Sequence, residues 1–75
     1  MNRISEEELN RLRHTYTRGS RVELDVMDDF QAPPPGTRGT VKKIDDTGNI
    51  LVSWDNGSSL NVLYGIDVCH LVKEN

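Results

Sequence analysis

Cysteine is nearly absent from this sequence: Cys69 is the single cysteine, and the histidines are His14 and His70. A lone cysteine excludes an internal disulfide, and with two histidines it falls short of the four ligands of a structural zinc site. The paired aspartates at 28–29 and 45–46 lack EF-hand spacing and have the chemistry of turn formers. We therefore expect no metal or other cofactor, and a reducing compartment.

Long apolar stretches are missing as well. The first eight residues are polar and lack the apolar segment of a signal peptide, and no stretch approaches the roughly 20 apolar residues of a membrane span. These features predict a cytoplasmic protein without membrane contact. With 75 residues, the chain has room for one domain, whose small core requires a compact arrangement.

Positive charge is in the minority, because 9 basic residues face 12 acidic ones and the net charge is -3. This balance opposes non-specific attachment to nucleic acid. The acidic run at 6–8 lies close enough to neutralise part of the one basic cluster. That cluster consists of Arg11, Arg13, Arg18 and Arg21. We therefore place nucleic acid last among the candidate partners.

A short helix is predicted within residues 1–18. Ser5 and Glu8 have the spacing of a capping box at its start, and Gly19 is the predicted stop. The apolar residues at helical spacing are Leu9, Leu12 and Tyr16. This stripe is narrow, so the helix must dock to persist. It either closes one end of the following domain or joins a second copy of the chain.

From Ser20 the apolar period changes to two, which is typical of strands with one buried face. Turn residues separate five such segments within 19–75. We therefore predict a mainly β fold, a small five-stranded SH3-like barrel behind the helix, because barrel closure removes open sheet edges. The residues that mark the five strands are Val22, Leu24 and Val26; Thr40, Val41 and Ile44; Ile50, Val52 and Trp54; Leu60, Val62 and Tyr64; and the run 68–72.

Three successive prolines stiffen the loop after the first strand. This loop is either a rigid lid over one barrel end or a preorganised binding loop. In the second case Gly36 and Gly39 bring backbone N–H groups to a ligand, and Arg38 offers its guanidinium to a phosphate or carboxylate. A third role, as a target for another protein's SH3 or WW domain, is disfavoured because such targets usually lie in flexible tails. The candidate binding residues here are Pro33, Pro34, Pro35, Gly36 and Arg38.

Four further residues join the candidate binding surface. Trp54 and Tyr64 either form a stacking platform or pack in the core and at the barrel mouth, and we favour packing. Asp55 and Asn56 belong to the Asn-Gly turn of a hairpin. Asp55 either caps this turn or orients the guanidinium of Arg38.

Two resemblances follow from motifs that occur in order. Gly39-Thr40-Val41, the run 50–58 and Tyr64-Gly65 resemble SH3-like barrels such as the Mib-Herc2 module, whose members bind protein partners. A longer set of runs resembles the bacterial family called domain of unknown function 4314, which is met in bacteria, phages and conjugative elements and has no assigned activity. This second resemblance extends over almost everything after Gly19. Its runs are 21–24, 27–29, 32–41, 52–60 and 67–69.

No catalytic site is expected. Cys69 would need a basic partner, and the adjacent His70 points to the opposite face of a strand. We expect a non-enzymatic binding module that grips a protein partner, or a second copy of itself, through the proline loop and the hairpin. Two alternatives stay open: an oligomer that sequesters a nucleotide-type small ligand in a counter-defence role, and a nucleic-acid-binding barrel.

Overall fold

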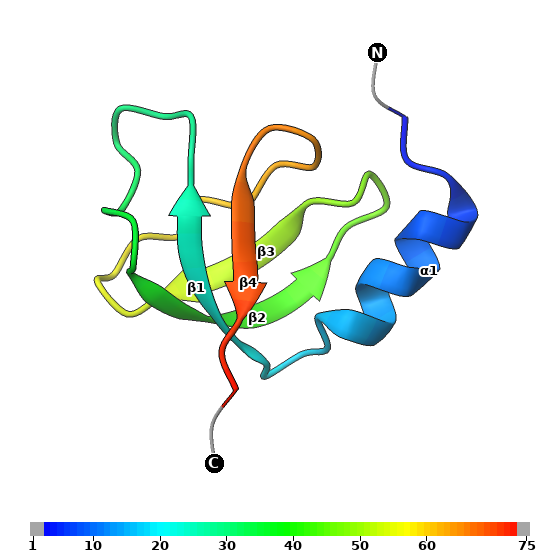
Figure 1. Ribbon diagram of the computed structural model, residues 1–75, viewed down its shortest axis with the longest axis horizontal. Coiled ribbons are helices and arrows are strands. Elements are labelled where there is room, and N and C mark those ends of the chain that lie inside the picture. Colours follow the sequence, from blue (N-terminus) through cyan, green and yellow to red (C-terminus); the bar gives the residue numbers. More distant parts are fainter. Residues whose placement is uncertain (1–2, 74–75) are drawn as a thin grey trace.

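A computed structural model describes residues 3–73 and shows one helix and four antiparallel strands (Figure 1). The strands form one sheet in the order β3-β2-β1-β4. The prediction of a mainly β fold with one helix is thereby confirmed, while residues 1, 2, 74 and 75 of the predicted ranges lie outside the description. The elements are α1 (Glu6–Thr15), β1 (Arg21–Val26), β2 (Arg38–Ile44), β3 (Ile50–Trp54) and β4 (Val68–Leu71).

The predicted five-stranded barrel is wrong: in the described part of the chain the sheet has four strands and is open, and the predicted last strand, 68–72, is present as β4. Residues 60–64, expected to form a strand, make only an isolated bridge between Ile50 and Val62. Backbone groups of this segment form hydrogen bonds with side chains instead of with a neighbouring strand. The Leu60 carbonyl accepts the Trp54 indole N–H at 2.7 Å, and the Tyr64 N–H donates to Asn49 Oδ1 at 2.9 Å. These hydrogen bonds use backbone groups that a strand would need for hydrogen bonds to its neighbour in the sheet.

Two β-bulges shift the phase of the strands. The register skips Asp25 in β1 and Lys42 in β2, so each bulge sets two residues against one on the partner strand. The bulge in β1 leaves Val26 54% exposed, although alternation predicted it to be buried. The bulge in β2 explains why Val41 and Ile44, three positions apart, are both buried.

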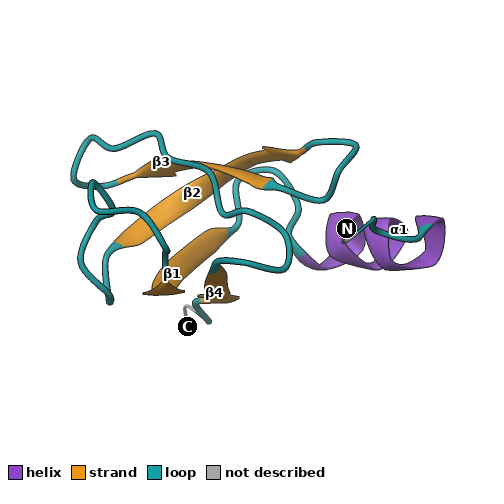
Figure 2. Cartoon of the chain, turned by 90° about the horizontal axis from the view of Figure 1, so that it is seen from above, coloured by secondary structure: helices purple, strands orange, loops and turns teal. Residues whose placement is uncertain are grey.

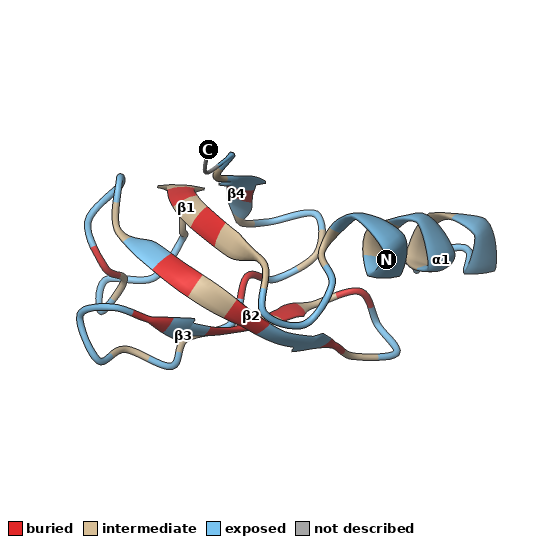
Figure 3. Ribbon diagram, turned by 90° about the horizontal axis from the view of Figure 1, so that it is seen from below, coloured by how far each residue is buried: buried red, intermediate tan, exposed pale blue. Residues whose placement is uncertain are grey.

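The core lies on one face of the curved sheet, and its buried residues alternate along the strands (Figure 3). Nine apolar residues form one cluster: Val22, Leu24, Val41, Ile44, Ile50, Val52, Trp54, Val62 and Cys69. This confirms that Ile50, Val52 and Trp54 share a buried face. Trp54 is only 2% exposed and is therefore a core residue.

The helix lies beside the sheet rather than across it (Figure 2). The Ser5 hydroxyl accepts the Glu8 N–H at 3.1 Å, as the predicted cap requires. The helix ends at Thr15, earlier than predicted, because the following backbone binds the sheet. The Gly19 N–H donates to the Val41 carbonyl at 2.8 Å, and the Val41 N–H donates to the Ser20 carbonyl at 2.8 Å. The helix-side residues that pack against the core are Leu9, Leu12 and Tyr16.

The turn between β2 and β3 is organised by the carboxylate of Asp45. It accepts hydrogen bonds from the backbone and side chains of Thr47 and Asn49, over distances of 2.9 to 3.1 Å. Burial alone would raise the pKa of Asp45, but these hydrogen bonds outweigh it and lower the pKa. Within residues 3–73, no helix combines the length and apolar character needed to cross a membrane.

Candidate functional site

The proline loop, residues 27–37, is fastened to β1 along its returning half. Pro33 is buried, whereas Pro34, Pro35 and Gly36 are exposed. Gly36 has φ of +91°, and its N–H donates to the Leu24 carbonyl at 2.8 Å. That hydrogen bond occupies the donor that was predicted to reach a ligand. Gly39, the other predicted donor, is buried in β2.

Arg38 and Asp55 are both exposed, but each has a different partner from the one expected. The Arg38 Nε donates to Glu23 Oε1 at 3.2 Å. The carboxylate of Asp55 accepts from the Arg21 guanidinium, with a Nη1–Oδ1 distance of 2.9 Å, and this hydrogen bond lowers the pKa of Asp55. The Asn56 Oδ1 accepts a hydrogen bond from the Ser58 N–H at 3.0 Å, which stabilises the turn.

Trp54 and Tyr64 do not form a shared stacking platform. Trp54 is enclosed in the core and pairs with Gly39 at one end of the β2–β3 hairpin. Tyr64 is half-buried and is held at the other end by Asn49 Oδ1, where its side chain packs against Gly48. The structure therefore divides the predicted site. The proline loop, Arg38 and the turn at 55–58 lie at one end, and Tyr64 lies at the other end, near the helix.

Exposed apolar side chains mark a surface that sequence periodicity did not predict. Phe30, in the proline loop, is 97% exposed, and Val26 and Val68 form an exposed cross-strand pair, 54% and 52% accessible. The end of β1 and the start of β4 meet here, with the proline loop and the loop before β4 rising on either side (Figure 1). Phe30 could have been noticed as the one phenylalanine of the chain, set in a polar loop.

A groove runs between the proline loop and the segment before β4. We call it the apical groove, and its volume is about 230 Å³. The Asp67 carboxylate joins its two walls, because it accepts the N–H groups of Asp28 and Leu63, each at 2.9 Å. Its apolar lining comprises Met27, Leu60 and Leu63, and its acidic lining Asp28, Asp29 and Asp67. The groove is thus bridged by hydrogen bonds between its two walls, partly apolar and lined by acidic residues.

A row of charged side chains crosses the outer face of the sheet. Glu23 in β1 is paired with Arg38 of β2 on one side and His70 of β4 on the other. The His70 ring lies 2.8 Å from a carboxylate oxygen of Asp25 through Nδ1, and 3.5 Å from Glu23 through Nε2. Sequence reasoning missed this contact because Asp25 is the bulged residue, whose direction alternation does not predict.

We expect His70 to titrate above its ordinary pKa of 6.5, since the hydrogen bond to Asp25 and the charge of Glu23 favour the protonated ring. Because the pKa is raised in the folded state, the contact stabilises the fold at low pH. This stabilisation is lost as the pH rises through the folded-state pKa. An NMR titration of the ring should show the raised value, and Asp25→Asn should lower it. An identical titration in both proteins would contradict the assigned contact.

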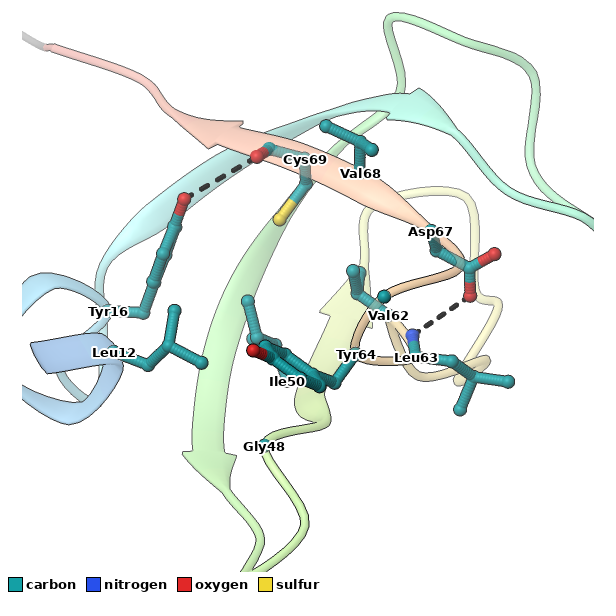
Figure 4. Close-up of a pocket in the computed structure, with 11 residues that line it drawn as sticks. Leu12, Tyr16, Gly48, Ile50, Val62, Leu63, Tyr64, Asp67, Val68 and Cys69 are labelled. Carbon is teal, nitrogen blue, oxygen red and sulfur yellow. Dashed lines mark hydrogen bonds between the residues drawn. The ribbon is translucent and has the colours of Figure 1, made fainter. Parts of the chain in front are cut away.

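A smaller apolar cavity of about 130 Å³ lies between the helix and the sheet (Figure 4). Leu12, Tyr16, Tyr64 and Cys69 lie on its walls. The Tyr16 hydroxyl donates to the Cys69 carbonyl at 3.5 Å. Burial, with a contribution from Asp25, raises the pKa of the Cys69 thiol to about 11. The thiol faces the core while His70 faces outward, so this histidine does not activate it.

Within residues 3–73, no three histidine, cysteine or acidic side chains are arranged to hold a metal ion. In the comparison with known protein families, the family model described as a domain of unknown function (DUF4314) matches residues 5–72. No curated protein and no solved structure matches the chain. The resemblance to SH3-like barrels therefore gains no support from a solved neighbour.

Proposed function

This chain belongs to the family of the domain of unknown function DUF4314, and we propose that it is a small binding module whose partner is a protein segment held at the apical groove. The observation that carries the proposal is a set of exposed apolar side chains that adjoin the groove lining in the sequence. Phe30, Val26 and Val68 project into solvent although the domain is small and its core is served by other residues. Val26 precedes Met27, Phe30 follows Asp29 and Val68 follows Asp67 of the groove lining, and exposed apolar side chains beside a groove are typical of interaction sites.

The groove is preorganised for such a partner. The proline loop is held to β1 through Gly36 and Thr37, and to the segment before β4 through Asp67. A loop that is already ordered loses little conformational entropy on binding. Phe30 can then act as an aromatic anchor, a residue type enriched at the energetic centre of interfaces.

The charges around the groove define the chemistry of the partner. Asp28 and Asp29 are exposed at the groove, and the chain as a whole carries a net charge of -3. Complementary charge steers association and disfavours partners of like charge. The fitting partner is a segment with aliphatic or aromatic side chains flanked by lysine or arginine.

Two polar side chains, Asp67 at the groove and Cys69 at the smaller cavity, also fit a binding role. Both oxygens of Asp67 accept backbone N–H groups, so this carboxylate serves the loop structure. The thiol of Cys69 is buried and has a raised pKa, opposite to the exposed, low-pKa thiol of a nucleophile. The cytoplasmic location and the bacterial, phage or mobile-element setting stay predictions.

Selection of random peptides on the immobilised full chain tests the proposal. We expect the enriched peptides to combine apolar side chains with lysine or arginine. Their affinity for Phe30→Ala and for Val68→Ser should fall by about tenfold or more, since buried apolar anchors dominate interface energies. Fluorescence anisotropy with one labelled peptide measures the loss for each variant.

The matched control is Leu71→Ala, which shortens an exposed apolar side chain at the far end of the same strand. It should leave peptide affinity unchanged. Equal binding by the Phe30→Ala variant and the parent would contradict the groove assignment. A concentration-dependent dimer that dissociates in Phe30→Ala, seen by sedimentation, would instead identify a second copy as the occupant and overturn the foreign-partner proposal.

A further inference from the structure

Some basic residues of this chain form ion pairs with acidic residues and others do not, within residues 3–73. Four arginines form ion pairs: Arg11 with Glu8, Arg13 with Asp46, Arg21 with Asp55, and Arg38 with Glu23. The five other basic residues form no ion pair with any residue of the range 3–73; they are Arg3, Arg18, Lys42, Lys43 and Lys73. Three of these five gather in one place, although the chain as a whole is acidic.

That place is a hollow of about 320 Å³ between the end of the helix and β2, here called the basic hollow. Arg18, Lys42 and Lys43 line it together with Arg13, and Tyr16 and Ile44 contribute apolar surface. Among residues 3–73, Arg13 is the one cation of the four with an acidic partner, Asp46, at 2.9 Å. Within the described part of the chain, the hollow therefore has four positive groups and one carboxylate paired with them.

The backbone explains why these residues converge. Adjacent residues of a regular strand point to opposite faces, but the bulge at Lys42 leaves both Lys42 and Lys43 exposed and lining the same hollow. Arg18 is brought next to them because Gly19 and Ser20 exchange backbone hydrogen bonds with Val41, each of 2.8 Å.

The helix side of the hollow is also held in place by hydrogen bonds, here from a side chain. The Arg13 guanidinium donates to the Ile44 carbonyl at 3.3 Å and to Asp46 at 2.9 Å, which holds the last turn of α1 against β2. Two segments about thirty positions apart in the sequence are therefore held together, and cationic residues of both segments line the hollow.

We propose that the basic hollow binds a small ligand with clustered phosphate groups. Guanidinium and ammonium groups form strong charge-assisted hydrogen bonds to phosphate oxygens, and the side chains of Tyr16 and Ile44 offer apolar contact to whatever carries the phosphates. A compact ligand is favoured over a nucleic-acid strand, because an extended polyanion would also meet the acidic surface of a chain with net charge -3.

This site is separate from the apical groove and does not depend on the function proposed there. The groove lies between the proline loop and the segment before β4, and its lining shares no residue with that of the hollow. The two sites also select opposite charges: cationic segments at the groove and anions at the hollow.

Titration of the full chain with inorganic tripolyphosphate at low ionic strength, followed by NMR and calorimetry, tests the inference. We expect saturable binding at one site per chain, with shift changes confined to residues around Arg18 and Lys42. The double variant Lys42→Gln/Lys43→Gln should weaken binding by about tenfold or more, since two charge-assisted contacts are removed.

The double variant Arg3→Gln/Lys73→Gln is the matched control, because it removes the same charge from two cations outside the hollow. It should bind almost as the parent does. Absence of binding by the parent, or equal weakening in both double variants, would overturn the site. A thymidine oligonucleotide that binds more tightly than tripolyphosphate, with a steep salt dependence, would overturn the small-ligand assignment in favour of nucleic acid.

Discussion

Replacing Gly39 with alanine should destabilise the domain by about 2 to 4 kcal/mol, enough to remove most of the stability that so small a fold possesses. An added Cβ would lie 2.6 Å from Val52 Cγ1, 2.9 Å from the Ser53 carbonyl oxygen and 2.9 Å from Trp54 Cε3. The Ser53 carbonyl belongs to the β3 backbone opposite Thr40, so it cannot retreat without disturbing the central strand pair. Thermal unfolding should shift down by about 10 to 20 °C.

Gly57→Ala is the control for this prediction. Gly57 has φ of +92° and no atom within 4 Å of an added Cβ, so alanine there meets only backbone strain, worth about 1 to 2 kcal/mol. Comparing denaturant midpoints of the two variants separates overpacking from backbone strain. A Gly39→Ala protein as stable as the parent would show that β2 and β3 are not packed as described.

Deleting residues 1–17 is expected to abolish cooperative folding. The truncation keeps Gly19 and Ser20 bound to Val41 but removes Leu9, Leu12 and Tyr16 from the core they cover. Partial burial of three such side chains is worth about 3 to 5 kcal/mol, comparable with the whole stability of a small domain. Far-ultraviolet circular dichroism during urea unfolding measures the loss.

Single substitutions refine the test of the helix. Leu12→Ala should destabilise the chain by about 2 kcal/mol, as expected for a partly buried leucine, whereas Asn10→Ala on the exposed face should change stability little. A truncated chain that stays folded and monomeric, made from an oligomeric parent, would favour the alternative in which the helix joins two copies. Full retention of stability and oligomeric state would refute both roles.

The candidate site could be predicted only in part. The proline loop was recognised from Pro33 to Pro35, because consecutive prolines restrict the backbone wherever they occur. Its anchor residue Phe30, and the exposed pair of Val26 and Val68, could not be found by periodicity, because the bulge at Asp25 reverses the expected direction of Val26. Alternation is informative only while the register is unbroken.

The basic hollow and the charged row on the sheet were beyond sequence reasoning for a related reason. The predicted basic cluster combined Arg11, Arg13, Arg18 and Arg21, which are close in the chain. The structure pairs Arg11 with Glu8 and Arg21 with Asp55, and it brings Lys42 and Lys43 to the remaining two. Such regrouping depends on contacts between distant segments, which charge spacing along the chain does not encode.

The sequence by itself determined the features that depend on near neighbours: the cap at Ser5, the period-two runs of β1 and β3, and the turn at Asp45. Helix capping, alternation and turn formation are set by residues within about four positions of each other. Tertiary structure alone decided that residues 60–64 do not form a strand. There, side chains from Trp54 and Asn49 take up backbone groups that a ladder would have used, and only folding brings these partners together.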